Sequence, residues 1–165
     1  MLATMRSLPA LTGALAATLV GISGAPALAE GRLIECDARA SAANLVEPWS
    51  ENTRSYAEGA VRVAALIDAD APACCRHFLL VLAPAGAEAG DAAGDAAPRQ
   101  CLVVGGFHDL DVGGIGATYS PHIGLLLSVP VWFWLNPGDM APDAEPFADR
   151  MKLLINQETG SVTIE

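Results

Sequence analysis

Residues 125–135, LLLSVPVWFWL, decide the fold because their side chains alternate as in a β-strand. In an extended chain, successive side chains point to opposite faces. One face of this stretch is therefore aliphatic: Leu125, Leu127, Val129, Val131, Phe133 and Leu135. The other face carries Leu126, Ser128, Pro130, Trp132 and Trp134. Because Pro130 has no N–H to donate to a neighbouring strand, the sequence predicts an edge strand or a bulge at that position.

Three segments upstream also have strand patterns. Residues 60–68 place Val61 and Val63 on one face and Arg62 on the other, which predicts a strand with one solvent-facing side. Residues 77–83 are apolar on both faces, as in a central strand that is covered on both sides. Residues 100–105 predict the return strand.

Downstream, residues 151–156 and 161–164 predict a hairpin around Gln157-Glu158-Thr159-Gly160, with Gly160 suited to a positive φ. Six strands with short connections, and no helix long enough for a crossover, imply antiparallel pairing. The predicted fold is mainly β: a single antiparallel sheet or small sandwich of about six strands, with one or two short helices near the N-terminus. Within residues 37–58, Asp37 and Ser50 are candidate helix N-caps, and Gly59 is a candidate helix end.

The first 29 residues are typical of a signal peptide. Arg6 gives a basic start, no charged residue follows up to Ala29, and the stretch ends in Ala27-Leu28-Ala29. We expect cleavage after Ala29 and a periplasmic or secreted mature protein without a membrane span. The alternative is an uncleaved anchor, since the uncharged run is long enough to cross a bilayer. Gly and Pro residues within the run argue against that alternative.

The mature chain is acidic and of single-domain size. We expect residues 30–165 to form one domain, with flexible loops at 84–98 and 136–150. The full chain has 9 Lys and Arg against 19 Asp and Glu, and losing Arg6 with the leader leaves a net charge of −11. This acidity argues against nucleic acids and anionic membrane surfaces as partners, because both select Lys and Arg clusters.

Cysteine usage fits an oxidising compartment. The four cysteines, Cys36, Cys74, Cys75 and Cys101, allow three pairings. We favour Cys36–Cys101, which would tie the amino end to a strand. A bridge between the adjacent Cys74 and Cys75 is unusual, because neighbouring Cα atoms lie ~3.8 Å apart, closer than in most disulfides. Those two cysteines are then thiols, a labile bridge or ligands; the competing pattern pairs each of them with a distant partner.

A metal site is a second use for the same residues. In an extended segment Cys75 and His77 would share a face, with Cys74 next to them, and thiolate with imidazole suits Cu(I) or Zn(II). Further ligands would have to come from His108 with Asp109, or from His122. The spacing matches no common metal motif, so disulfide bonding is favoured and no cofactor is expected.

Trp132 and Trp134 are the candidate ligand-binding residues. Strand alternation places both opposite the aliphatic stripe, where an aromatic pair can stack on a sugar, hold a peptide or close a homodimer. The alternative is that the amino arm, with Trp49 and Tyr56, covers this face and makes it part of the core.

No catalytic motif is present. Gly113-Gly114-Ile115-Gly116 lacks the pattern of a phosphate loop and predicts a flexible turn. Glu88, Asp91 and Asp95 lack calcium-loop spacing. The sequence contains no GxSxG, SxxK or HExxH. It therefore favours a protein that is not an enzyme, although a hydrolase site assembled only in space stays an alternative.

Three segments carry a family resemblance: residues 41–49 (SAANLVEPW), Arg99-Gln100-Cys101, and residues 156–160 (NQETG). Together they resemble a group of small exported bacterial proteins with no assigned activity. The resemblance implies one cysteine near the mature amino end and one in the Arg-Gln-Cys position, in agreement with a Cys36–Cys101 pair. It marks Cys74 and Cys75 as departures. The overall expectation is a non-catalytic exported protein that binds an envelope protein or a small ligand, with copper or zinc handling and an undetected hydrolase as alternatives.

Overall fold

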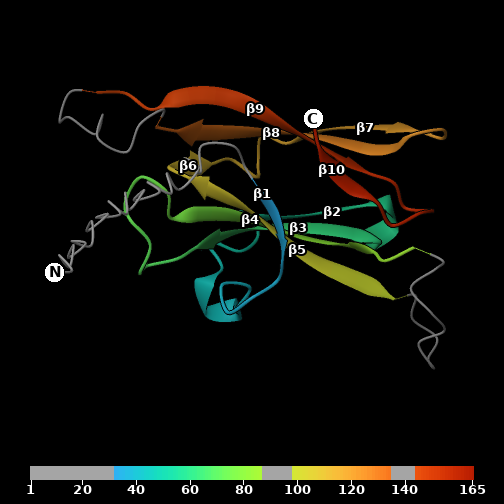
Figure 1. Cartoon of the computed structure of the whole chain (residues 1–165), viewed down its shortest axis with the longest axis horizontal. Coiled ribbons are helices and arrows are strands. Elements are labelled where there is room, and N and C mark those ends of the chain that lie inside the picture. The colour runs from blue at the N-terminus through green and yellow to red at the C-terminus, as the bar shows by residue number, and fades with distance from the viewer. Residues whose placement is uncertain (1–31, 87–97, 135–143) are drawn as a thin grey trace, which may run out of the picture.

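The chain folds into two antiparallel β-sheets packed face to face (Figure 1). The computed structural model describes residues 32–86, 98–134 and 144–165. Sheet A has the order β1 (Arg32–Glu35), β5 (Arg99–Phe107), β4 (His77–Pro84), β3 (Val61–Ile67) and β2 (Thr53–Tyr56). Sheet B has the order β10 (Val162–Ile164), β9 (Phe147–Ile155) and β8 (Gly124–Phe133), with β6 (Asp109–Leu110) and β7 (Gly116–Ser120) sharing the far side of β8.

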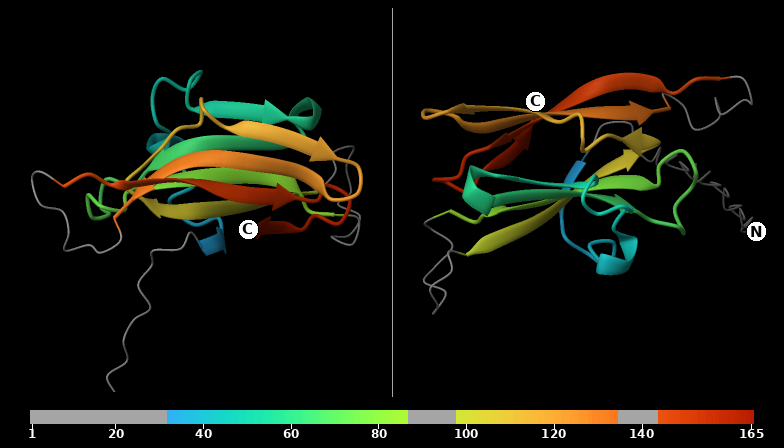
Figure 2. Two further views of the ribbon diagram at one scale, coloured as in Figure 1. Left: turned by 90° about the horizontal axis from the view of Figure 1, so that it is seen from above. Right: turned by 180° about the vertical axis from the view of Figure 1, so that it is seen from behind.

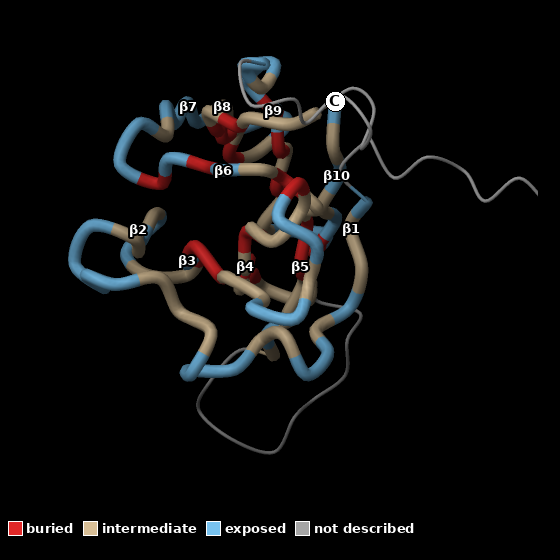
Figure 3. The backbone as a smooth tube through the Cα atoms, turned by 90° about the vertical axis from the view of Figure 1, so that its left-hand side faces the viewer, coloured by how far each residue is buried: buried red, intermediate tan, exposed pale blue. Residues whose placement is uncertain are grey.

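The core lies between the two sheets, whose strands run roughly in line (Figures 1 and 2). Leu125, Leu127, Val129 and Val131 of β8 are buried there, as their alternation predicted, in one cluster with inward-facing residues of β3 and β4. Phe133 is half-buried against the same cluster, and Leu135 lies outside the described residues. Figure 3 shows the buried backbone concentrated where the sheets face each other. The predicted mainly-β class is therefore confirmed, and the sandwich form is the one observed.

β8 is a central strand, so the prediction of an edge at Pro130 is wrong. It pairs with β9 from Leu125 to Phe133 without a register shift, which also excludes the predicted bulge. On its other side, β7 ends opposite Ser128 and β6 begins opposite Val131. Pro130 lies between these two segments, and its carbonyl accepts from the Asp111 N–H at 3.1 Å. The missing proline donor thus falls where the neighbouring strand is interrupted, and no ladder bond is lost there.

An arm formed by residues 36–45 covers the outer face of sheet A. It includes a 3₁₀ turn, η1 (Ala42–Asn44), and appears in Figure 1 as the blue-to-cyan segment beside sheet A. Ala40 and Leu45 pack onto a cluster of Leu66, Phe78 and Val103. This confirms that β4 is covered on both faces. It also corrects the expected solvent-facing side of β3, which is exposed only at Arg62.

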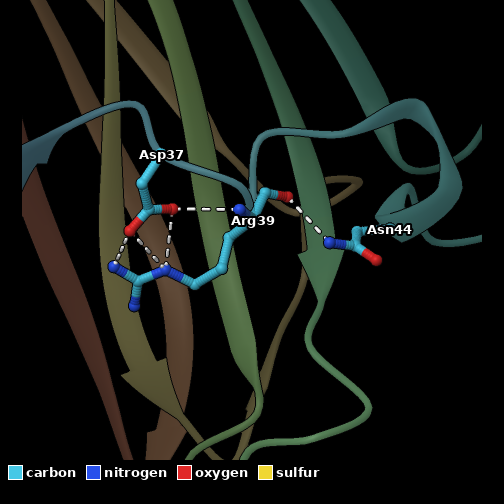
Figure 4. A network of polar contacts seen from close by, with 3 residues as sticks. All are labelled: Asp37, Arg39 and Asn44. Carbon is cyan, nitrogen blue, oxygen red and sulfur yellow. Dashed lines mark hydrogen bonds and ion pairs between the residues drawn. The ribbon is translucent and has the colours of Figure 1, made fainter.

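The arm is held by one covalent bond and a polar network. Cys36 is bonded to Cys101 of β5, with Cα atoms 5.3 Å apart, as predicted. Asp37 accepts from the Arg39 backbone N–H and guanidinium, and Asn44 donates to the Arg39 carbonyl at 3.0 Å (Figure 4). The Arg39 guanidinium also lies 4.9 Å from the centre of the Phe78 ring, a cation–π contact.

The helices differ from the prediction. Asp37 does not cap a helix, because its carboxylate is engaged by Arg39; Ser41 caps η1 instead, accepting from Ala43 N–H at 3.3 Å. No helix begins at Ser50, whose carbonyl accepts from the Arg54 guanidinium. A second 3₁₀ turn, η2 (Ala57–Gly59), ends at Gly59 with φ +86°, in line with the predicted end.

The predicted C-terminal hairpin is present as β9 and β10, with Gly160 at φ +74°. Gly160 N–H donates to the Asn156 carbonyl at 2.9 Å, and the Asn156 side chain accepts from two further turn amides. Gln100 Nε2 donates to the Pro84 and Gly160 carbonyls, which joins this turn to the end of sheet A. β9 begins at Phe147, so the last part of the predicted loop 136–150 is a strand. The leader, residues 1–29, and most of both predicted loops lie outside the described residues.

We predict that the two disulfides contribute very differently to stability. Replacing Cys36 and Cys101 by Ser should cost about 4 kcal/mol of unfolding free energy, because their bridge closes a loop across 65 residues. Replacing Cys74 and Cys75 by Ser is the matched control and should cost under about 1 kcal/mol, since a bridge between neighbours barely restricts the unfolded chain. Urea unfolding of the mature protein measures both. Equal losses of unfolding free energy in the two variants would contradict the conclusion that the Cys36–Cys101 disulfide holds the arm on sheet A.

The Asp37–Arg39 pair predicts a specific acid sensitivity. The Arg39 hydrogen bonds lower the pKa of Asp37 from 3.8 to about 2. A carboxyl with a lowered folded-state pKa adds stability above its unfolded pKa and loses it as the pH falls toward the folded pKa. This contribution should therefore disappear between about pH 4 and pH 2. The difference in urea midpoint between wild type and Asp37→Asn should shrink over that range. In an Arg39→Gln background, Asp37→Asn should have little effect at any pH.

Candidate functional site

The outer face of sheet B is open to solvent. We define the open face as the outward residues of β8 and β9: Leu126, Ser128, Pro130, Trp132, Ala148, Arg150, Lys152 and Leu154. All eight are exposed or half-buried, whereas the inward residues between them on both strands are buried over most of the length. No described element lies over this face (Figures 1 and 2). Sheet A has a covering arm and sheet B has none in the described part of the chain.

Trp132 lies on the open face, half-buried, opposite Ala148 on β9 and Asp109 on β6. Trp134 follows the end of β8 and packs edge-on against His108, with ring centroids 5.6 Å apart. Its indole Nε1 is buried and has no hydrogen-bond partner among the described residues. The two tryptophans thus have different surroundings: Trp132 faces solvent across the sheet, and Trp134 contacts the corner where the chain passes between sheets.

The open face combines apolar and cationic groups. Arg150 and Lys152 lie two positions apart on β9, opposite Pro130 and Ser128. Arg150 donates to Ser128 Oγ at 2.9 Å and to the Gly114 carbonyl at 3.1 Å, which fixes its guanidinium on the sheet. Lys152 is exposed. On the other side of β8, Asp109 of β6 lies opposite Trp132, so this face carries both signs of charge.

Trp49 and Tyr56 do not cover the open face. Tyr56 ends β2 and packs against the core between the sheets. Burial raises the pKa of its hydroxyl, and the nearby Arg54 guanidinium opposes part of that rise. Trp49 lies in the loop before β2 with 55% of its surface exposed. Sequence reasoning used Trp49 only as a covering residue; its exposed position follows from a loop that the sequence pattern did not describe.

Cys74 and Cys75 are bonded to each other in a turn. Cys75 N–H donates to the Pro72 carbonyl at 2.9 Å, so this segment is not the extended one in which Cys75 and His77 would share a face. His77 begins β4, and its Nδ1 lies 2.5 Å from the His108 carbonyl. Because a carbonyl only accepts, His77 donates from Nδ1 here. The described residues contain no group of three or more His, Cys, Asp or Glu side chains placed to hold a metal.

His108 marks the corner at which the chain leaves sheet A for sheet B. Its N–H donates to the Trp132 carbonyl at 2.7 Å, and its own carbonyl meets the His77 ring. Gly106, with φ +94°, occupies the extra position where the β4–β5 register shifts. Bulges of this kind let a strand turn from one sheet into another. His77 and His108 therefore hold the corner. His122 lies exposed in the turn between β7 and β8.

The glycine-rich segment Gly113-Gly114-Ile115-Gly116 connects β6 to β7. A Cβ on Gly114 would lie 2.4 Å from the Asp111 carboxylate and 3.1 Å from Pro130, so a larger residue there would displace the Asp111 side chain. The Arg150 guanidinium also donates a hydrogen bond to the Gly114 carbonyl. These contacts tie the segment to sheet B and place a carboxylate beside it, which does not suit a phosphate. Glu88, Asp91 and Asp95 lie outside the described residues.

No family model matches this chain, and no similar curated protein or solved structure was found. In residues 32–86, 98–134 and 144–165, none of the helices is long and apolar enough to cross a bilayer.

We predict that Trp49 dominates the solvent-exposed tryptophan fluorescence. Replacing it by Phe should shift the mean emission to shorter wavelength and lower the acrylamide quenching constant, because a mostly exposed indole is removed. Trp134→Phe should lower quenching less, since its indole nitrogen is buried. Steady-state quenching of the mature protein makes the comparison. A larger effect from Trp134→Phe would contradict the exposed position of Trp49.

Proposed function

We propose that this chain is an exported, non-catalytic binding protein whose open face docks a protein of the cell envelope. The observation that carries the proposal is the asymmetry of the sandwich. One outer face is covered by a disulfide-bonded arm, and no described residue covers the other, which carries the half-buried Trp132. The predicted leader and the two disulfides support export to an oxidising compartment, where such bridges persist. The resemblance to small exported bacterial proteins is a further argument for the proposed export.

The shape of the open face favours a protein partner over a small ligand. Small-molecule sites are concave and bury most of the ligand. The open face is the outer side of two paired strands, and a surface of this kind suits contact with another protein. Trp132 is the expected anchor, because tryptophan and arginine at the centre of an interface carry much of the binding energy. Arg150 and Lys152 favour a partner with acidic groups around an apolar contact.

A photo-cross-linker tests the proposal in the cell envelope. Placed at Ala148, which is exposed and opposite Trp132, it should give one adduct of defined mass. The same group at Ala69, which is exposed in the loop between β3 and β4, is the control and should not give that adduct.

The adduct from position 148 should fall at least about tenfold with Trp132→Ala, the loss expected for a hot-spot residue. Tyr119→Ala is the matched variant: Tyr119 is a 62% exposed aromatic of sheet B, directed to the opposite side from Trp132, and its loss should leave the adduct unchanged. Equal cross-linking from both positions, or an adduct indifferent to Trp132, would contradict docking through the open face.

A further inference from the structure

The disulfide between Cys74 and Cys75 lies in the loop that joins β3 to β4, away from the open face. Because the two residues are neighbours, their Cα atoms are 3.8 Å apart. Disulfide-bonded residues usually have Cα atoms roughly 4.4–6.8 Å apart, and a departure from this range makes the bond easier to reduce. The Cys36–Cys101 bond, at 5.3 Å, lies within the range. The two bonds should therefore differ in how readily a reductant opens them.

The loop is held by backbone hydrogen bonds that involve no sulfur atom. Asp68 N–H donates to the Arg76 carbonyl at 2.9 Å across the base of the loop. Cys75 N–H donates to the Pro72 carbonyl, also at 2.9 Å. The pairing of β3 with β4 begins directly below these contacts. Since none of these bonds depends on the disulfide, we expect the loop to keep its backbone conformation when the disulfide is reduced.

Folding protects the two disulfides to very different degrees. Thermodynamic reciprocity requires the fold to disfavour reduction of a bond by the same factor by which that bond stabilises the fold. For Cys36–Cys101, whose residues are 65 positions apart, this factor is roughly a thousand. For adjacent cysteines the factor is close to one, because neighbours stay together in the unfolded chain as well. Folding therefore adds almost no resistance to reduction of Cys74–Cys75.

The two cysteines of this bond also differ in their access to solvent. Cys74 is buried, with 5% of its surface exposed, whereas Cys75 is half-buried. Pro72 and Ala73, which precede them in the loop, are exposed. A thiolate that approaches from solvent should therefore attack the Cys75 sulfur and release the Cys74 sulfur.

We infer that the Cys74–Cys75 disulfide is a redox-active site that accepts two electrons from thiols. A thiolate forms a bond to the Cys75 sulfur as the Cys74–Cys75 bond breaks, which gives a mixed disulfide and a Cys74 thiolate. A second thiolate attacks the sulfur of the first reductant molecule in this mixed disulfide and releases the Cys75 thiolate. The two reductant molecules leave joined as a disulfide, and the two protons that they lost pass to Cys74 and Cys75. The site is independent of the open face, because neither cysteine belongs to β8 or β9.

Glutathione is the probe, because each disulfide can be equilibrated with known mixtures of its reduced and oxidised forms. The folded mature protein is quenched with acid after equilibration, and alkylation with peptide mass mapping gives the reduced fraction of each pair. The Cys36–Cys101 bond is the internal control. Cys74–Cys75 should be half-reduced at a ratio [GSH]²/[GSSG] at least about a hundredfold lower than Cys36–Cys101. Equal ratios, prior reduction of Cys36–Cys101, or a Cys74–Cys75 pair that never changes its state would each overturn the inference.

Two matched variants identify the sulfur that is attacked. Cys74→Ser leaves the half-buried Cys75 as a thiol, and Cys75→Ser leaves the buried Cys74. The Cys75 thiol should react with 5,5′-dithiobis(2-nitrobenzoate) at least about tenfold faster than the Cys74 thiol, because access limits the reaction. Urea unfolding confirms that both variants are folded. Equal rates, or faster reaction of Cys74, would overturn the assignment of Cys75 as the attacked residue.

Discussion

The packing of the arm onto sheet A is the interaction on which the rest of the structure depends. A β-sandwich has four faces, and the two inner ones cover each other. The outer face of sheet A is apolar at Leu66, Phe78 and Val103, and without the arm these side chains would be exposed to water. Leaving any one of these side chains exposed costs about 1.5–3 kcal/mol of folding free energy. The few local contacts within the arm could not offset that cost. The Cys36–Cys101 bond holds the arm over them.

Sheet B has no such requirement, because its outward residues mix apolar with polar and charged ones. Ser128 and Lys152 share that face with Trp132, and it tolerates water. This difference between the two outer faces is why we place the binding surface on sheet B. The alternation of inward and outward side chains along β8 lets this single strand line the core on one side and present an indole on the other.

The long strands could be predicted from the sequence, and of the short ones only β10 could, because the turn before it is visible in the sequence. β3, β4, β5 and β8 each have an alternating or fully apolar run of six or more residues, so their period is visible. β1 and β2 have four residues each and β6 has two; they exist because a longer neighbour offers hydrogen-bonding groups along its edge. The position of Pro130 was misjudged for the same reason. Proline lacks a backbone N–H, but it fits in a central strand where the neighbouring strand is interrupted, as between β7 and β6. The local sequence does not show where a neighbouring strand ends.

The candidate sites divide in a similar way. The Cys36–Cys101 pair followed from residue type and placement, and Trp132 was placed outward by alternation alone. The roles of His77 and His108 required the tertiary structure, because they meet only where the chain changes sheets. The exposed position of Trp49 could not be predicted from the sequence pattern, because this residue lies in an irregular loop held by its own hydrogen bonds.

Hydroxyl-radical footprinting of the isolated mature protein tests the central claim most directly, with each residue's rate of oxidation normalised to that in the unfolded chain. Trp132, Leu126 and Leu154 on the open face should react readily. Leu66, Phe78 and Val103 under the arm are almost fully buried and should be protected by at least about tenfold in comparison. Equal reactivity of the two sets, or protection of the open face in the free protein, would contradict the asymmetry from which the proposed function follows.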